Sequence, residues 1–144
     1  MDTQSVYAIC VLNNTDKGIK GVIKFEQPAT GPTVISINFS GLKPGKHGFH
    51  IHEFGNLSNA CVTAGAHFNP FKKTHGGPGM DERHVGDLGN VEADQNGNYV
   101  GEIKDNLVRL TGETSVIGRS VIVHEDEDDL GKVKLINLTT IIGK

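Results

Sequence analysis

The sequence predicts an all-β fold, an antiparallel sandwich or barrel of about eight short strands joined by turns. Several short segments alternate apolar and polar residues, which is the period of a strand with one buried face. The chain has 19 glycines among 144 residues, enough for the many turns that such a fold needs. No segment shows a convincing helical period, and the length fits a single domain spanning residues 1–144.

The first three expected strands cover residues 5–12, 19–26 and 33–40. The third shows the alternation most clearly, because every second residue is apolar. Its residues follow in the order Ile35, Ser36, Ile37, Asn38, Phe39, Ser40. Each of these segments is therefore expected to bury one face and to expose the other.

A turn at Pro44 and Gly45 precedes a fourth expected strand, Lys46–Glu53. A long irregular segment follows, from Phe54 to about Asp87, rich in glycine, asparagine, proline and lysine. Compact domains rarely contain so long a loop unless it is functional or held in place. Most of the histidines lie in or beside it, so metal binding would explain how the loop stays ordered.

The C-terminal half contains further strand-like segments. Two of them flank Asp94-Gln95-Asn96-Gly97, a typical hairpin turn. The expected strands here are Leu88–Ala93, Tyr99–Lys104, Asn106–Leu110, Val116–His124 and, as the last strand, Val133–Ile142.

Charge and composition exclude several classes of protein. The formal net charge is −3 and the isoelectric point is about 6.1, without a basic patch that would favour nucleic-acid binding. No segment has the length and hydropathy of a transmembrane helix. The N-terminal residues lack the basic and apolar regions of a secretory signal, so a cytoplasmic protein is expected.

The chain has two cysteines, Cys10 and Cys61. A disulfide between them is compatible with their number, but two free thiols are the preferred interpretation for a reducing compartment. Cys10 lies in an apolar segment, where we expect a small buried side chain.

Histidines are concentrated in one part of the chain, with six of the seven between His47 and His84. His50 and His52 are two residues apart in an expected strand. They therefore point to the same face, with Cα atoms roughly 6.6 Å apart. Such a pair can converge on one metal ion, and His124, at the end of a later strand, could complete an all-imidazole site suited to copper or zinc. The alternative for the pair is a polar strand face.

Four further residues suggest a second site. His67, His75 and His84 lie in the long loop, and Asp87 follows three residues after His84. Three nitrogens and one carboxylate form a plausible tetrahedral zinc set. Their spacing matches no zinc finger, and the alternative is a polar loop with solvated histidines.

Several motifs, in order, resemble those of the Cu/Zn superoxide dismutase family. His47–Gly55 is similar to the family's copper-site strand, and Ala64–Pro70 to the start of its zinc loop. The other matching motifs are His75–Pro78, Arg83–Asn90, Gly118–Glu125 and Asp128–Gly131. This resemblance runs from about residue 6 to Gly131, roughly nine-tenths of the chain.

The resemblance implies a role for each matched residue. Copper would be bound by His50, His52, His67 and His124, which form the catalytic site. Zinc would be bound by His67, His75, His84 and Asp87, so that His67 bridges the two metals as an imidazolate. Asp128 would hydrogen-bond ligands of both metals, and His47 would be structural.

The fold implied is an eight-stranded Greek-key β-sandwich with a long metal-binding loop. The substrate implied is superoxide, which is disproportionated to oxygen and hydrogen peroxide. Family members are usually dimers, and Phe54-Gly55 and Ile117-Gly118 match positions near the family's dimer contact. A copper chaperone is a further expected partner.

The resemblance ends after Gly131. Family members usually continue with an arginine that guides superoxide, a cysteine that pairs with the loop cysteine, and a final apolar strand. Here no arginine follows Arg119 and no cysteine follows Cys61. We therefore expect a dismutase of reduced rate, in which Cys61 lacks its usual partner.

Two alternatives are also compatible with the sequence. One is a zinc- or copper-binding protein with little activity, which buffers metal or binds a chaperone or a family partner. The other is a copy that folds poorly and has no activity. The complete ligand set favours the enzyme, and the missing arginine and cysteine favour the binding protein.

Overall fold

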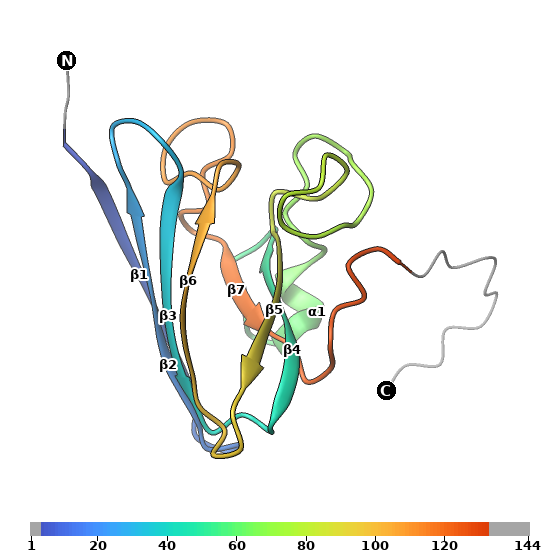
Figure 1. Cartoon of the computed structure of the whole chain (residues 1–144). Coiled ribbons are helices and arrows are strands. Elements are labelled where there is room, and N and C mark those ends of the chain that lie inside the picture. Colours follow the sequence, from blue (N-terminus) through green and yellow to red (C-terminus); the bar gives the residue numbers. More distant parts are fainter. Residues whose placement is uncertain (1–3, 133–144) are drawn as a thin grey trace, which may run out of the picture.

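The computed structural model describes residues 4–132, which form two antiparallel sheets packed face to face (Figure 1). One sheet has the strand order β1 (Val6–Asn14), β2 (Ile19–Gln27), β3 (Thr33–Ser40), β6 (Tyr99–Asp105). The other has the order β5 (Asp87–Ala93), β4 (Gly45–His52), β7 (Ser120–Val123). The predicted all-β sandwich is confirmed.

The core lies between the two sheets and follows the predicted alternation. Ile35, Ile37 and Phe39 of β3 are buried, and the serines and asparagine between them are exposed. Phe39 meets Phe49 of β4 edge to face, with ring centroids 5.9 Å apart. Such burial of apolar surface is the main stabilising contribution to a sandwich.

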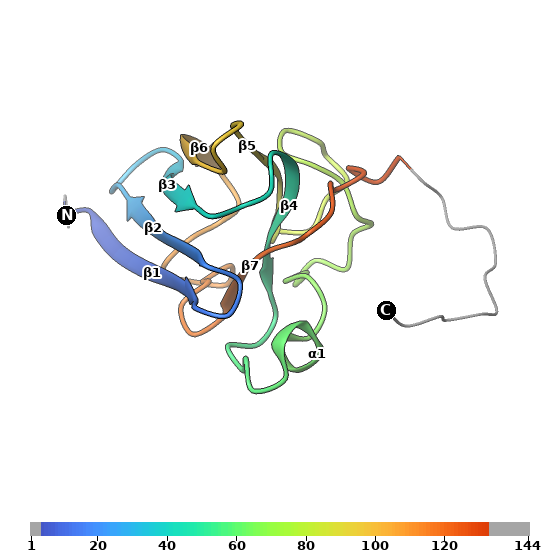
Figure 2. The same ribbon diagram turned by 90° about the horizontal axis from the view of Figure 1, so that it is seen from below.

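β4 is buried on both faces, unlike β3. Phe49 and Ile51 point into the core, whereas His50 and His52 lie on the opposite face of the sheet. The long segment between β4 and β5, including the short helix α1 (Ala60–Ala64), covers this second face (Figure 2).

The long segment is held to β4 by main-chain hydrogen bonds. Phe68 donates to the carbonyl of Ile51 (2.8 Å), and Ile51 donates to that of Gly86 (3.0 Å). Gly86 allows this contact, since a Cβ there would lie 2.1 Å from the oxygen of Ile51. Cys61 is a free, exposed thiol, so within the described residues these bonds replace a disulfide.

Several expected elements differ in the structure. Residues 106–110 form no strand, because Asp105 Oδ1 accepts the main-chain N–H groups of Leu107 and Val108 and so turns the chain. The expected strand Val116–His124 is reduced to β7, since Val116 to Arg119 form a turn. The helix α1 was not predicted.

Two further expectations concern β1 and the C-terminus. Cys10 is half-buried rather than buried, because β1 is an edge strand with a neighbour on one side only among the described residues. The expected strand Val133–Ile142 lies outside the described residues.

Candidate metal centre

His50, His52, His67 and His124 each offer a ligand atom, and these atoms lie within 4.8 Å of one another. β4 supplies the first two, the long loop supplies His67, and His124 directly follows β7. The Nε2 atoms of His52 and His124 are 3.4 Å apart. β4, the long loop and the residue after β7 therefore bring the four predicted imidazoles together.

The orientation of His52 is fixed by a hydrogen bond outside this group. Its Nδ1 donates to the carbonyl oxygen of Gly65 at 2.8 Å. A carbonyl only accepts, so the proton is on Nδ1 and the lone pair of Nε2 faces the other imidazoles. A second contact of this kind joins His47 Nδ1 to the carbonyl oxygen of His124 at 2.8 Å, in line with the structural role expected of His47.

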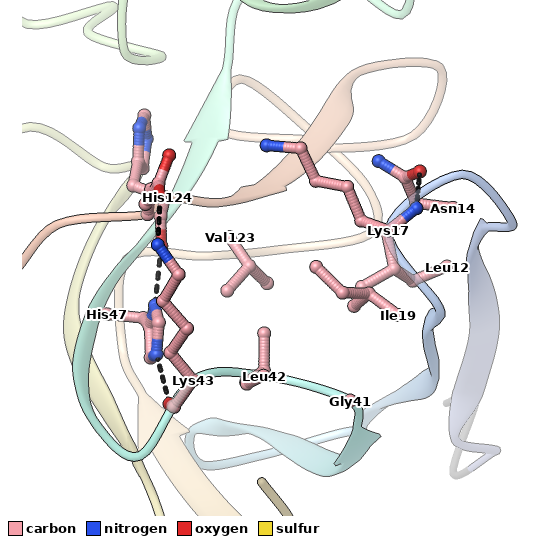
Figure 3. A pocket seen from close by; sticks show the side chains of 11 residues that line it. Leu12, Asn14, Lys17, Ile19, Gly41, Leu42, Lys43, His47, Val123 and His124 are labelled. Atoms are coloured by element: carbon pink, nitrogen blue, oxygen red, sulfur yellow. Dashed lines mark hydrogen bonds and ion pairs between the residues drawn. The ribbon is translucent and has the colours of Figure 1, made fainter.

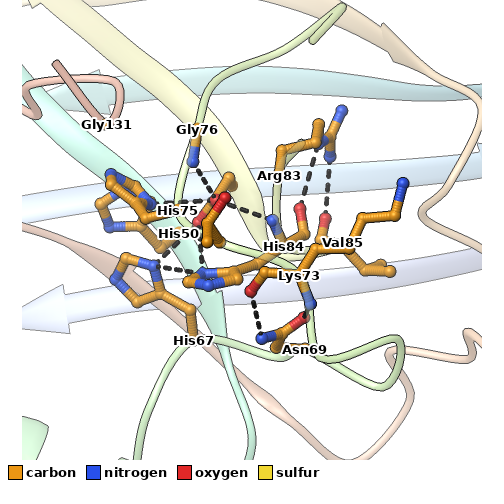
Figure 4. A network of polar contacts seen from close by, with 12 residues as sticks. His50, His67, Asn69, Lys73, His75, Gly76, Arg83, His84, Val85 and Gly131 are labelled. Carbon is orange, nitrogen blue, oxygen red and sulfur yellow. Dashed lines mark hydrogen bonds and ion pairs between the residues drawn. The ribbon is translucent and has the colours of Figure 1, made fainter. Parts of the chain in front are cut away.

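His67, His75, His84 and Asp87 form a second group, whose ligand atoms also lie within 4.8 Å of one another (Figure 4). Asp87 is fully buried at the start of β5. Its Oδ1 is 2.8 Å from His67 Nδ1 and 3.1 Å from His84 Nδ1, and its Oδ2 is 2.9 Å from His75 Nδ1.

His67 belongs to both groups. Its Nδ1 faces Asp87, which leaves Nε2 for the group around His50. The rings of His50 and His67 are stacked, with centroids 4.0 Å apart. The two candidate sites are therefore adjacent and share one imidazole.

Asp128 contacts one histidine from each of the two ligand groups. Its Oδ1 is 2.8 Å from His75 Nε2 and 3.4 Å from His50 Nε2. The segment that carries it is attached to β5 by two hydrogen bonds with Asn90, at 3.1 and 2.7 Å. Contacts of this kind fix the orientation of metal-ligating histidines.

The hydrogen-bonding pattern of the two groups fits two bound cations. Within the described residues, both ring nitrogens of the buried His50 lack a hydrogen bond, and Nδ1 of His75 has only the nearby Oδ2 of Asp87, at 2.9 Å. Buried polar atoms without a partner are costly, and a metal ion would satisfy them. Four imidazoles suit copper, and three imidazoles with a carboxylate suit a tetrahedral zinc ion.

The protonation states also favour metal binding. Burial lowers the pKa of His50 to about 2 and that of His124 to about 4, with neighbouring imidazoles adding to the effect. Burial also lowers the pKa of His52 and His84. These rings are therefore neutral at physiological pH, which is the form that binds metals.

In the group that contains Asp87, carboxylates and hydrogen bonds shift the pKa values against the effect of burial. Burial disfavours the charged form of Asp87, but hydrogen bonds from His67 and from the main chain of Gly76 and His84 outweigh it and lower its pKa. At His75 burial is likewise outweighed, by Asp87 and Asp128, and the pKa is raised. Asp87 therefore remains ionised as a ligand.

Two arginines support the site, although sequence reasoning gave them no structural role. Arg83 is buried in the loop, with Nη1 2.6 Å from Asp105 Oδ2 at the end of β6. Arg119 lies over the ring of Phe68, 3.6 Å from its centroid, and donates to the carbonyl of Glu53 at 2.7 Å. The resemblance contained both residues, but only the fold shows their partners.

Together the two sheets and the adjoining ligand groups define a β-sandwich protein with a candidate two-metal centre. A family model described as copper/zinc superoxide dismutase matches residues 19–143. The chain belongs to the copper/zinc superoxide dismutase family, whose metals are copper and zinc. The matched range includes residues beyond Gly131, where the quoted motifs end.

Individual relatives agree. A superoxide dismutase [Cu-Zn] of Saccharomyces cerevisiae is 55% identical over 129 residues, 88% of this chain and 83% of that protein. Superoxide dismutase [Cu-Zn] 5 of Dictyostelium discoideum is 53% identical over 126 residues, 87% of this chain and 82% of that protein. Within the described residues, no helix is long and apolar enough to cross a membrane.

Proposed function

We propose that this protein disproportionates superoxide to oxygen and hydrogen peroxide. The observation that carries the proposal is the pair of ligand groups that share His67. Relatives named superoxide dismutase [Cu-Zn] are 50–55% identical over most of the chain, which supports the same reaction here.

Copper is assigned to the four-histidine group, and zinc to the group that contains Asp87. Copper tolerates all-imidazole sites and is the redox metal of the pair, whereas zinc has no redox chemistry. The charged Asp87 supports zinc at the second group, where it stabilises a closed, structural site. Copper ligands would be His50, His52, His67 and His124, and zinc ligands His67, His75, His84 and Asp87.

Bound copper would supply the one-electron chemistry, oxidising one superoxide and reducing another. The protein supplies the surroundings. The contact of His52 with Gly65 holds one ligand lone pair in place, and Asp128 orients His50 and His75. His67 Nε2, at the boundary of the two groups, is the atom at which a proton can be held next to the substrate.

The expected rate is lower than that of a typical family member. Arg119 is the last arginine of the chain, and its guanidinium is engaged by Glu53 and Phe68. These contacts hold the guanidinium against Phe68 and the main chain of Glu53, and no arginine follows Arg119 to guide superoxide. Charge steering raises association rates by about 10–10³, and the net charge of −3 gives superoxide no such help.

The test is superoxide decay by the protein loaded with copper and zinc, normalised to the copper bound. We expect catalytic decay faster than that caused by the same amount of free copper. Decay no faster than free copper, or no bound copper, would favour the second candidate: a metal-binding protein that buffers metal or engages a copper chaperone. The missing guiding arginine is the feature that favours this candidate.

We also propose a cytoplasmic homodimer of single-domain subunits with Greek-key connectivity. Two apolar side chains near the expected contact, Phe54 and Ile117, are 53% and 59% exposed. Exposed apolar side chains that lie together often mark an interface. Sedimentation of the wild type as a dimer, and of Ile117→Asp as a monomer, would support this; a monomeric wild type would contradict it.

A further inference from the structure

The four-stranded sheet has an outer face that points away from the core and away from the sheet that carries the metal centre (Figure 1). Large apolar side chains are exposed on it, with Val100 at 76% and Ile9 at 64%. Apolar side chains exposed together on one face often mark an interaction surface. On β2, β3 and β6 the outer face consists of Val22, Lys24, Glu26, Val34, Ser36, Asn38, Val100, Glu102 and Lys104.

The strand register arranges these side chains in three rows across the sheet, each with one residue from β2, β3 and β6. The rows are Val22, Asn38 and Val100; Lys24, Ser36 and Glu102; and Glu26, Val34 and Lys104. In both charged rows, the residue of β2 and the residue of β6 have opposite signs. The signs are also reversed from one charged row to the next.

The charges of these rows are not neutralised within the sheet. Lys24 and Glu102 lie on either side of β3, two strand spacings or about 10 Å apart, and neither forms an ion pair among the described residues. By contrast, Lys43, which lines the cavity of about 450 Å³ shown in Figure 3, is paired with Glu125. The outer face therefore offers charges of both signs to a partner.

The middle of the outer face is hollowed over β3. Two adjoining cavities, of about 540 and 590 Å³, are both lined by Val22 and Asn38. The second is also lined by Ser36, Val100 and Glu102. The short side chains of β3 therefore form the floor of a depression, and the longer side chains of β2 and β6 form its two sides.

We propose that the outer face binds the same face of a second copy of this chain, about a two-fold axis that runs close to β3. Rotation about this axis places β2 of one copy over β6 of the other and keeps each row opposite itself. Each residue of β2 then lies opposite the residue of β6 from its own row. The facing pairs are Lys24 with Glu102, Glu26 with Lys104, and Val22 with Val100.

This arrangement satisfies the face better than a neighbouring one. Sheets that pack face to face keep their strands within about 30° of each other, so the twist of each sheet is accommodated near the axis. The amide of Asn38, on the axis, both donates and accepts and so is complementary to itself. An axis shifted to lie between β2 and β3 would instead place Glu102 opposite Ile9, which leaves a charge without a partner.

The proposed contact is weaker than the one expected near Phe54 and Ile117, and lies on a different surface. Exposed ion pairs each contribute little, and small, polar interfaces dissociate readily. The contact would therefore add to the homodimer only at high protein concentration. It requires neither bound metal nor activity, so it is independent of the proposed reaction.

Sedimentation of full-length Ile117→Asp isolates this contact from the other. At protein concentrations of about 0.1–1 mM, the range of weak complexes, this variant should form reversible dimers. Addition of Lys24→Glu or of Glu102→Lys should weaken the association at least about tenfold, because like charges then face each other at two symmetric points. A monomer throughout this range, or no weakening in either variant, would overturn the proposal.

Mixing the two variants tests the pairing itself. In a 1:1 mixture of Lys24→Glu with Glu102→Lys, both made in Ile117→Asp, a mixed dimer again has opposite charges at both points, so association should return to within about threefold of the Ile117→Asp value. Both residues are exposed, so neither substitution should unfold the chain. Failure of this mixture to associate would overturn the proposal.

The control for net charge is Glu113→Lys, in the exposed loop between β6 and β7. It changes the net charge as Glu102→Lys does, but at a position outside the outer face. Its mixture with Lys24→Glu should not restore association, and equal restoration by both mixtures would overturn the proposed pairing. Glu26 and Lys104 are less suitable for this test, because Glu26 already accepts hydrogen bonds from Ser5 and Tyr7.

Discussion

At the residue scale, several ligands have one nitrogen or oxygen free because another contact holds the remainder of the side chain. His52 is held by Gly65, and His75 by Asp128. The buried carboxylate of Asp87 is held by two main-chain N–H groups, of Gly76 and His84. Preorganised ligands of this kind lose little conformational entropy when a metal binds.

Replacement of His124 by alanine should remove copper and copper-dependent activity while zinc is retained. His124 belongs to the four-histidine group and makes no contact with Asp87 among those resolved. Metal content by mass spectrometry of the purified variant measures both ions. Loss of zinc with copper retained would reverse the assignment of the two groups.

Replacement of Asp87 by alanine should chiefly remove zinc and loosen the long loop. The carboxylate contacts three histidines and two main-chain N–H groups of that loop, so all five lose a partner. Zinc content and limited proteolysis of the loop measure the effect, with Glu92→Ala on the exposed side of β5 as the matched control. Unchanged zinc content in Asp87→Ala would contradict its role as a ligand.

At the element scale, the long loop is bound to the sandwich at several points other than the ligands. Main-chain bonds attach it to β4, and the ion pair of Arg83 with Asp105 attaches it to the end of β6. The stacking of Arg119 on Phe68 connects it to the turn before β7. These contacts give the loop much of its shape in the absence of a disulfide within the described residues.

Replacement of Arg83 by methionine should destabilise the protein by about 3–5 kcal/mol, because it leaves the carboxylate of Asp105 buried and unpaired. Both side chains are at most 4% exposed. Denaturant unfolding measures the change. The control is Arg109→Met, whose guanidinium donates to the carbonyl of Gly31 and to no carboxylate among the described residues, and it should change stability by about 0.5 kcal/mol or less. Equal effects of the two substitutions would show that the buried pair contributes little.

At the scale of the whole molecule, the metal centre lies on one of the two sheets, with ligands from β4, the start of β5, the residue after β7 and the long loop. β4 is the central strand of its sheet and carries both core residues and copper-site residues on its two faces. Metal binding and folding are therefore coupled, and a bound ion stabilises the native state in proportion to the logarithm of its concentration.

The metal-free protein should lose stability as the pH falls below about 6.5. The unfolded chain then protonates histidines that the folded protein keeps neutral, each adding a slope of about 1.4 kcal/mol per pH unit. For His124 the loss extends to about pH 4, and for His50 to about pH 2, because their pKa values are lowered to these values by burial. Denaturant unfolding from pH 7 to pH 4 measures it; a flat profile would contradict neutral, buried histidines.

The sequence by itself determined the class of fold, six of the seven described strands to within two residues at each end, and the residues of both candidate ligand groups. Alternation of apolar residues predicts a strand wherever one face is buried, as in β3, and motif order carried the ligand set. The strand prediction failed at residues 106–110, where the side chain of Asp105 accepts hydrogen bonds from main-chain N–H groups. The helix α1 was also not predicted. Local pattern does not include these competing contacts.

Only the tertiary structure decided how the ligands meet and what surrounds them. His50 and His124 are 74 residues apart in sequence, and their rings are 4.8 Å apart only because β4 pairs with β7. The partners of Arg83 and Arg119 and the contact of Asp128 with two histidines also depend on distant segments packed together. A one-dimensional pattern records which faces are apolar, but packing and pairing between distant segments determine which faces meet.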